Sequence, residues 1–239
     1  MKVAIIGYGK MGHEVEKILH QMNMQVGATI DNESEWTEKL DLLKSCDVAI
    51  EFSIPDLAIE NFKKCIAIKI PVVSGTTGWY SHFYDVIDLF NQANVSFIYG
   101  SNFSIGANLF FASVSYLSKM MNTMDQYHPQ IDETHHITKK DAPSGTAITT
   151  AELMIAQLDH YKEWISDRQT ADNQIPVFSH RVGDAFGEHL VTFSSNEDTL
   201  TISHRANNRV GFAVGAVKSA IWLINNPGIY NISEIYTKI

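Results

Sequence analysis

Lys2-Val-Ala-Ile-Ile-Gly7-Tyr8-Gly9-Lys10-Met11-Gly12 is the stretch of sequence that decides the fold. Its apolar first half is typical of a buried strand, and its glycines have the spacing G-x-G-x-x-G. Apolar residues then recur at the spacing of one helix face: Val15, Ile18, Leu19 and Met22. A second strand is expected at residues 25–30 and ends in Asp31, about twenty residues beyond the glycines. Together these features predict a dinucleotide-binding fold.

The glycine-rich loop and the acid that follows it are the candidate cofactor site. Gly7 allows the tight turn, Gly9 lets a pyrophosphate approach the backbone, and Gly12 lets the helix pack against the strand. Asp31 would accept hydrogen bonds from the adenosine ribose hydroxyls. The other loop residues complete the expected contact: Tyr8, Lys10 and Met11. The alternative is an ordinary strand, turn and helix that use glycine only to turn sharply.

Strands and helices continue to alternate through the first hundred residues or so. Further strands are expected at residues 46–53, 71–74 and 95–99, with helices at residues 56–66 and 79–92. This alternation predicts an α/β domain with a Rossmann-type, doubly wound parallel sheet, in which ligands bind beyond the carboxyl ends of the strands. Two loops at that edge are candidates to hold the nicotinamide half of the cofactor, or merely to turn the chain: Gly75, Thr76 and Thr77, and Gly100, Ser101, Asn102 and Phe103.

The pattern changes after residue 104. Helices are expected at residues 109–121 and 146–158, a loose strand at residues 127–136, and several strands between residues 177 and 204. This α+β character predicts a smaller second domain with a mixed or antiparallel sheet at residues 105–207. A last helix at residues 211–225 is expected to return residues 208–239 to the dinucleotide-binding domain, whose main part is residues 1–104.

Composition excludes several classes of protein. The chain has 239 residues, 45% of them hydrophobic, which is enough for one large or two modest domains. Its net charge of −9 argues against nucleic acid as a partner. The two cysteines, Cys46 and Cys65, are expected to be reduced and inert in a cytoplasmic protein. No basic and apolar leader is visible, and no apolar run approaches the ~20 residues that a bilayer requires, so no membrane is expected as a partner.

The richest chemistry lies in residues 132–147, where His135, His136 and Lys139 precede a turn and a helix that begins near Ser144. Imidazoles transfer protons near neutral pH, and lysines either do so or hold anions. The amides at the helix start can bind a carboxylate. This pattern predicts a site that binds a small anion and protonates it.

Simpler interpretations of the same residues stay open. One histidine could be a packed core residue, Lys139 and Lys140 could be surface charges, and Ser144 could be a plain N-cap. Adjacent histidines on a strand point to opposite faces, and no zinc motif is present, so no metal site is expected.

Residues 133–147, Glu-Thr-His-His-Ile-Thr-Lys-Lys-Asp-Ala-Pro-Ser-Gly-Thr-Ala, resemble the signature E-x-H-H-x-x-K-x-D-A-P-S-G-T-A of the 4-hydroxy-tetrahydrodipicolinate reductase family. Further blocks follow in the family's order along nearly the whole chain: the N-terminal glycine loop, Gly75–Gly78, Asn102–Gly106, Arg181–Asp184, Gly187–His189 and His204–Arg209. The resemblance implies an enzyme that reduces a cyclic, unsaturated imine dicarboxylate with NADH or NADPH in lysine biosynthesis.

The resemblance also implies roles for individual residues. His135 would be the acid/base residue, and Lys139 the proton donor or its electrostatic partner. His136 would hold one substrate carboxylate, and Ser144, Gly145 and Thr146 would hold the other at the helix start. It further implies a homotetramer, joined through the sheet of the second domain.

The chain departs from the family at the glycine loop, which is one residue shorter than the usual G-x-x-G-[RK]-M-G. Asp31 is followed by Asn32 rather than by a basic residue, so we expect NADH to serve at least as well as NADPH, although Lys10 could still reach a 2′-phosphate. Two alternatives remain at this point. One is a reductase or dehydrogenase of another small imine or amino dicarboxylate such as aspartate, and the other is a non-catalytic NAD(H)-sensing module.

Overall fold

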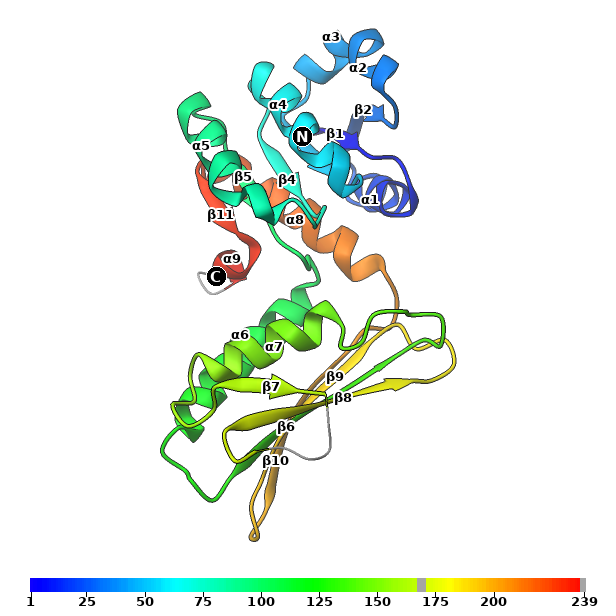
Figure 1. The fold of residues 1–239 in the computed structure, drawn as a ribbon. Helices are drawn as coiled ribbons and strands as arrows, with labels where there is room; N and C mark the ends of the chain where they lie inside the picture. Colours follow the sequence, from blue (N-terminus) through cyan, green and yellow to red (C-terminus); the bar gives the residue numbers. More distant parts are fainter. Residues whose placement is uncertain (167–170, 237–239) are drawn as a thin grey trace. The chain divides into compact units, whose positions relative to one another are not determined.

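The structure, a computed structural model, describes residues 1–166 and 171–236. The chain divides into two compact units, residues 1–105 with 210–239, and residues 106–209. The boundaries expected from the sequence were 104/105 and 207/208. Residues 237–239 of the expected return segment lie outside the described residues. Figure 1 shows the two units, with the return segment in orange and red.

A six-stranded sheet, whose pairings are all parallel, forms the middle of the first unit. Its order is β11-β5-β4-β3-β1-β2. The strands are β1 (Lys2–Ile6), β2 (Gln25–Ile30), β3 (Val48–Glu51), β4 (Val72–Ser74), β5 (Phe97–Tyr99) and β11 (Ile229–Asn231). Because every strand runs the same way, all the carboxyl ends meet at one edge. The predicted doubly wound α/β fold is confirmed.

Helices cover both faces of this sheet (Figure 1). On one face, α1 (Lys10–Gln21) and α8 (Val210–Asn225) pack their apolar residues against Val3, Ile5 and Ile50. On the other face, α4 (Pro55–Ala67) and α5 (Phe83–Ala93) pack against Ala4, Ala49 and Val72. Alternate residues of each strand point to opposite faces, so both sets must be apolar, which is why these strands read as continuous hydrophobic runs.

The second unit is built on a five-stranded mixed sheet in the order β10-β9-β6-β8-β7. Its strands are β6 (His128–His135), β7 (Glu163–Ile165), β8 (Gln174–Arg181), β9 (Glu188–Ser194) and β10 (Thr199–Arg205). Strand β6 is parallel to β8 and antiparallel to β9. Helices α6 (Ile105–Met121) and α7 (Gly145–Ile155) form the unit's core with one face of the sheet, through Ile131, Val177 and Val191.

Several elements differ from their expected bounds. The helix expected at residues 79–92 is a short 3-10 turn, η1 (Tyr80–His82), followed by α5. Helix α6 begins at Ile105 rather than at residue 109, and α7 ends at Ile155 rather than at residue 158. Short elements escaped the sequence patterns altogether: β7, β11, α2 (Glu33–Glu38), α3 (Leu40–Lys44) and α9 (Ile232–Tyr236). Such segments are too short to show a full hydrophobic period.

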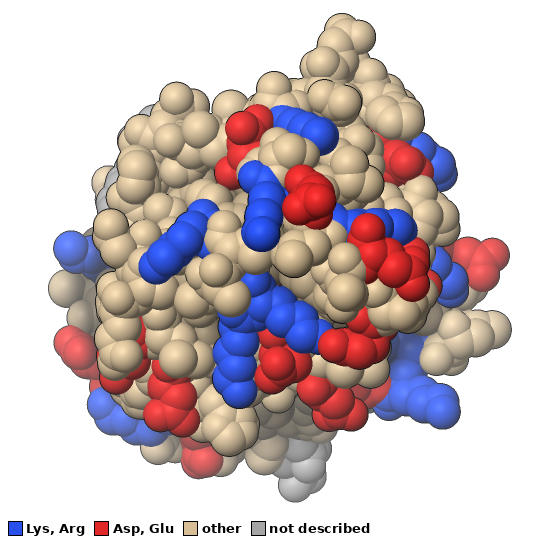
Figure 2. Space-filling view, turned by 90° about the horizontal axis from the view of Figure 1, so that it is seen from above, with Lys and Arg blue, Asp and Glu red and all other residues tan. Residues whose placement is uncertain are grey.

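Charged side chains of both signs are interleaved on the face seen in Figure 2. The described residues also form ion pairs, such as Lys64 with Glu33 at 2.5 Å and Lys39 with Glu35 at 2.6 Å. Within the described ranges, no helix is long and apolar enough to span a bilayer.

Candidate active site

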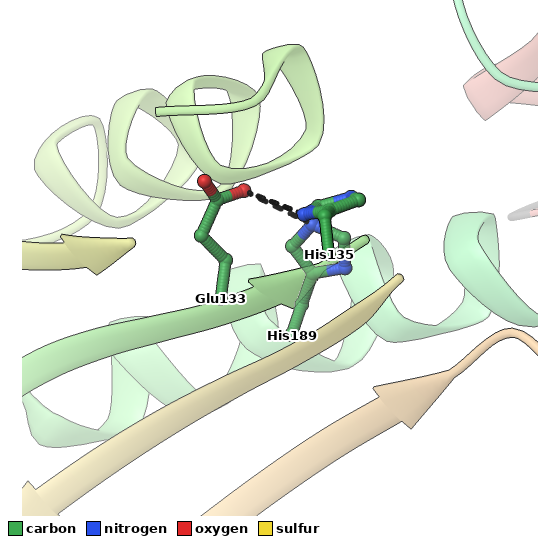
Figure 3. A group of neighbouring side chains, drawn as sticks. All are labelled: Glu133, His135 and His189. Atoms are coloured by element: carbon green, nitrogen blue, oxygen red, sulfur yellow. Dashed lines mark ion pairs between the residues drawn. The ribbon is translucent and has the colours of Figure 1, made fainter. Parts of the chain in front are cut away.

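Strand β6 places two ionisable side chains on the inner face of the second unit. Its residues alternate between inner and outer positions, and Ile131, Glu133 and His135 are all inward and buried. Strand β9 pairs with β6 in a register that sets His189 opposite Glu133. The alternation of side chains along β6 and this register therefore bring Glu133, His135 and His189 together, as Figure 3 shows.

The carboxylate of Glu133 is the meeting point of this cluster. Its Oε2 atom lies 3.3 Å from Nδ1 of His135 and 3.8 Å from Nε2 of His189 (Figure 3). The two imidazole rings meet edge to face, with 5.1 Å between their centroids. Nδ1 of His135 is buried and makes no well-aligned hydrogen bond within the described part of the chain, so its contact with the carboxylate is an ion-pair contact.

Glu133 is held as an anion by its other neighbours. The Ser144 amide donates to both carboxylate oxygens at 3.1 Å, and the Arg181 guanidinium lies 3.3 Å from Oε1. Burial raises the pKa of this carboxyl, but the contacts from His135 and Ser144 outweigh burial and bring the pKa far below its usual range. A buried negative charge therefore faces His135.

His189 is the uncharged member of the cluster. Burial, with the charge of His135 as a further cause, lowers its pKa to about 4. Its Nε2 atom lies 3.2 Å from the hydroxyl of Ser144. That hydroxyl also accepts a hydrogen bond from the amide of Ala147 at 3.2 Å, as the N-cap of α7. Ser144 therefore joins the start of α7 to the histidine cluster and is more than a plain cap.

Arg181, at the end of β8, also holds the loop that carries Lys139. Its Nη2 atom donates to the carbonyl of Asp141 at 2.5 Å and its Nε atom to the carbonyl of Lys139 at 3.4 Å. The Lys139 ammonium pairs with the Asp141 carboxylate at 2.8 Å, which lowers the pKa of that carboxyl. Lys139 is half-buried and Lys140 is exposed. One guanidinium thus ties the Lys139 loop to Glu133.

The remaining residues expected to bind the substrate lie at the start of α7 or just after β6. His136 is half-buried just beyond β6, and its Nδ1 atom lies 2.7 Å from the hydroxyl of Thr138. It does not join the buried cluster. Gly145 is exposed, and a Cβ built on it would meet no atom within 4 Å. The first amides of a helix have no partner within the helix, so the backbone at Gly145 and Thr146 suits an anion.

Glu133, His135 and His189 also offer three metal-type ligand atoms within 4.8 Å of one another. The donors around Glu133 argue for a different use of this carboxylate. Arg181 already supplies a positive charge, and the Ser144 amide contacts both oxygens. This arrangement suits an ion-paired carboxylate better than a metal ligand, and the absence of a metal site stays a prediction.

In the first unit, the glycine-rich loop has the geometry that its sequence suggested. Gly7 has φ +85°, and a Cβ there would lie 2.2 Å from the carbonyl oxygen of Phe52. Gly12 lies against the Gly7 carbonyl, whereas a Cβ on Gly9 would meet nothing within 4 Å. One oxygen of Asp31 accepts a hydrogen bond from the Tyr8 amide at 3.0 Å. Asp31 therefore holds the start of the loop in place.

The two later loops also lie at the carboxyl edge of the sheet. Gly75 and Thr76 follow β4, and Thr76 is buried while Thr77 is exposed. Gly100, Ser101 and Asn102 follow β5, and Asn102 accepts a hydrogen bond from the Ser104 amide. The Phe103 side chain is buried in the core of the first unit, so only its backbone is available to a ligand.

Sequence reasoning missed the network that surrounds His135. The family signature and its further blocks include Glu133, Arg181 and His189, but no role could be given to them from the sequence. Strand register brings them together, and no local pattern indicates register. One signal was present. Glu133 and His135 are two residues apart in a segment of strand-like alternation, which puts them on one face.

The first unit has a parallel sheet with a glycine-rich loop, and the second carries a buried histidine–carboxylate cluster. Together these features are those of a two-domain, dinucleotide-dependent oxidoreductase. Two family models cover nearly the whole chain: dihydrodipicolinate reductase, N-terminus, over residues 1–103, and dihydrodipicolinate reductase, C-terminus, over residues 106–236. The chain belongs to the dihydrodipicolinate reductase family. Reductases of this family use NADH or NADPH, and the N-terminal domain binds the cofactor.

Individual relatives agree over full length. The chain is 37% identical to a 4-hydroxy-tetrahydrodipicolinate reductase of Christiangramia forsetii, over all of this chain and 99% of the relative. It is 34% identical to one of Rickettsia bellii, over 97% of this chain and 92% of the relative. A dipicolinate-bound dihydrodipicolinate reductase from Paenisporosarcina sp. TG-14 has the same fold, with a TM-score of 0.81 at 24% identity over 98% of this chain and 99% of that one.

Proposed function

We propose that the protein reduces 4-hydroxy-tetrahydrodipicolinate to tetrahydrodipicolinate and water with NADH or NADPH, in the diaminopimelate route to lysine. The observation that carries the proposal is the pairing of buried, anionic Glu133 with His135 beside the start of α7, in a chain that matches its family from end to end. The reaction consumes one hydride from the nicotinamide and one proton, and it releases the substrate hydroxyl as water.

His135 is assigned the acid/base step. With Nδ1 held against Glu133, its Nε2 atom faces Gly187, where a Cβ would lie only 3.0 Å away. Gly187 has φ +143°, so the backbone there favours glycine, and the missing side chain avoids a close contact with the nitrogen. The anionic carboxylate orients the imidazole and keeps its hydrogen on Nδ1, as in other carboxylate–histidine pairs. Nε2 is then the nitrogen that exchanges a proton with the substrate.

The positive and N–H groups around His135 are assigned to the two substrate carboxylates. Lys139 supplies a proton or positive charge when it exchanges its contact with Asp141 for the substrate. His136 binds one carboxylate. The amides of Gly145 and Thr146, with Ser144 as the cap, bind the other at the start of α7. In support, the Paenisporosarcina enzyme was captured with dipicolinate, a planar ring that bears two carboxylates.

The cofactor is assigned to the carboxyl edge of the first unit's sheet. The pyrophosphate would lie against the loop from Gly7 to Gly12, and Asp31 would hold the adenosine ribose. The nicotinamide would lie near Gly75, Thr76 and Thr77 and near the backbone of residues 100–103. Asn32 caps α2 and is followed by Glu33 and Glu35 in the first turn. This acidic surrounding disfavours a 2′-phosphate and supports NADH as at least an equal substrate.

The expected homotetramer and a cytoplasmic location belong to the same proposal. The face of the second sheet that lacks α6 and α7 carries alternate residues such as Asp132, Phe178 and Leu190, which are only half-buried in the single chain. Contact between copies through that face would bury them. Sedimentation or light scattering of the purified protein measures the assembly directly.

The test of the function is oxidation of NADH and NADPH, followed at about 340 nm, with substrate made in place from pyruvate and aspartate semialdehyde by a synthase. Rapid turnover that pyridine-2,6-dicarboxylate inhibits competitively is the expected result. Turnover with an open-chain imine of aspartate in preference to the cyclic substrate would move the assignment to another reductase. Tight NADH binding without turnover of either substrate would leave only the sensing module.

A further inference from the structure

Glu51 is a buried acid that the reaction does not use directly. It is the last residue of β3, which lies between β4 and β1 in the sheet, and its side chain is fully buried. Burial raises the pKa of its carboxyl, while hydrogen bonds from neighbouring groups oppose that effect. A buried acid at the carboxyl edge of such a sheet is costly to keep, so its partners are informative.

The partners of Glu51 are uncharged donors on two loops. Its Oε1 atom accepts from the Ser53 amide at 3.0 Å, from the Ser53 hydroxyl and from the Thr76 hydroxyl at 2.9 Å. Its Oε2 atom accepts from the Ser74 hydroxyl at 2.6 Å. One carboxylate thus joins the loop after β3 to the end of β4 and the loop after it.

The two loops are further tied to each other and to their surroundings. The Ser53 amide also donates to the Thr76 hydroxyl at 2.8 Å, and the indole of Trp79 donates to the Thr76 carbonyl at 2.8 Å. Between these residues, Phe52 is wedged against two glycines. A Cβ on Gly7 would lie 2.2 Å from the Phe52 carbonyl oxygen, and one on Gly75 would lie 2.0 Å from its ring. A shift of residues 52–53 would therefore move the glycine-rich loop as well.

The direction of these bonds has a chemical consequence. A hydroxyl has one hydrogen to donate and two lone pairs that accept. Because Ser53 and Thr76 give their hydrogens to Glu51, a ligand that reaches their oxygens meets them as acceptors. Each already accepts once, from Asn61 and from the Ser53 amide respectively, and keeps one lone pair. Such acceptors suit the amide N–H or ribose O–H groups of a nicotinamide nucleoside.

We propose that Glu51 is a positioning residue for the dinucleotide, which fixes the Ser53 and Thr76 loops and turns their hydroxyl oxygens into acceptors for the nicotinamide half. The proposal rests on the proposed function, since it assumes that these loops hold the cofactor. It makes Glu51 a determinant of cofactor affinity, although the carboxylate itself touches only protein groups.

The test inverts the polarity of this residue without changing its size. In Glu51→Gln, an amide N–H₂ replaces one acceptor and competes with the hydroxyl donors. We expect the KM for NADH and the Kd for NADH, measured by protein fluorescence, to rise at least about fivefold, as for the loss of one hydrogen bond to a charged group. We expect kcat at saturating NADH to stay within about threefold. A purely structural role would reduce the active fraction, and hence kcat, and leave the KM of the remaining enzyme unchanged.

The matched control is Ser74→Ala, which removes the Oε2 donor within β4 but leaves Ser53 and Thr76 on Oε1. Its KM for NADH should stay within about twofold of that of the original chain. Glu51→Asp should rescue most of the affinity, because it keeps the carboxylate. If the glutamine variant does not fold, Glu51→Asn is compared with Glu51→Asp. These two side chains have the same size and differ, like glutamine and glutamate, in an amide against a carboxylate. The proposal is overturned if the amide variant, Glu51→Gln or Glu51→Asn, binds NADH as tightly as the protein with the corresponding carboxylate. Failure of the original chain to oxidise NADH, with binding intact, would count against the function and not against this role.

Discussion

Nδ1 of His135 lies 3.3 Å from Oε2 of Glu133, and both side chains occupy the inner face of β6 because they are two residues apart. The contact fixes which nitrogen of the imidazole faces the protein and which is left for a ligand. It also places a fixed negative charge next to the group that is proposed to gain and lose a proton.

Replacing the carboxylate of Glu133 should therefore slow the chemical step. Glu133→Gln keeps the size of the side chain but removes the negative charge that faces and orients His135, so we expect kcat to fall at least about tenfold. NADH affinity should stay within about twofold. Steady-state kinetics with Glu197→Gln, an exposed carboxylate of the β9–β10 hairpin, as the control measures the effect. A kcat within threefold of the original would remove Glu133 from the mechanism.

The roles of His135 and Lys139 predict large losses of rate. His135→Ala or Lys139→Ala should each lower the rate of hydride transfer by about 10²-fold or more, the usual effect of removing a positioned acid. Single-turnover absorbance measurements separate this step from product release. Lys140→Ala is the matched control, because Lys140 is the exposed neighbour of Lys139. Near-normal turnover in both test variants would show that the acid/base assignment is wrong.

Asp31 should set the balance between the two cofactors. Its carboxylate accepts the Tyr8 amide and would repel a 2′-phosphate at the ribose, so NADH should be used at least as efficiently as NADPH. Asp31→Ser should raise the ratio of kcat/KM for NADPH to that for NADH severalfold, which is about 1 kcal/mol or more of relative binding energy. An unmodified chain that favours NADPH tenfold or more contradicts this prediction.

The low pKa of His189 should make the fold sensitive to mild acid. The ordinary histidine pKa is 6.5, and burial brings it to about 4 in the folded chain. Between these values the unfolded chain binds the proton more tightly, so the free energy of unfolding is fully retained above pH 6.5 and falls towards pH 4. The loss is on the order of 3 kcal/mol. Glu133 adds acid sensitivity of the same sign only below its usual pKa of 4.5.

Thermal denaturation between pH 7 and about pH 4.5 checks this expectation. His189→Gln cannot take up the proton, so its Tm should fall less across this range than that of the original chain, whatever its Tm at pH 7. His20→Gln, at an exposed position of α1, serves as the control and should keep the original pH dependence. Parallel curves for all three proteins would refute the assignment of acid sensitivity to His189.

Much of the fold could be predicted because its strongest signals are local. The strand, glycine loop and helix at residues 2–21 depend on near neighbours, and the alternation of strands and helices fixes a parallel sheet. The edge strand β11, of three residues, has no such signal, since it is defined only by its pairing with β5. Burial on both faces also hides the helical or strand period of short segments.

The candidate site likewise has residues that a local pattern predicts and residues that only strand pairing brings together. His135, Lys139 and Ser144 lie within ten residues and could be named from the sequence. The contacts of Arg181 and His189 with Glu133 depend on the pairing of β6 with β8 and β9, across separations of more than forty residues. Nor does any sequence pattern indicate that Glu51 holds two loops, because its partners are brought together by the sheet edge.

The return of α8 and β11 to the first unit reverses the order in which the two units can mature during synthesis. The second unit is complete once residue 209 has emerged, whereas the first lacks a helix and an edge strand until residues 210–231 follow. Until then Val3, Ile5 and Ile50 lack the apolar cover that α8 provides. Chains released early therefore carry a finished second unit beside a first unit whose sheet has one face covered by α1 alone, and such exposed apolar surface attracts chaperones and proteases.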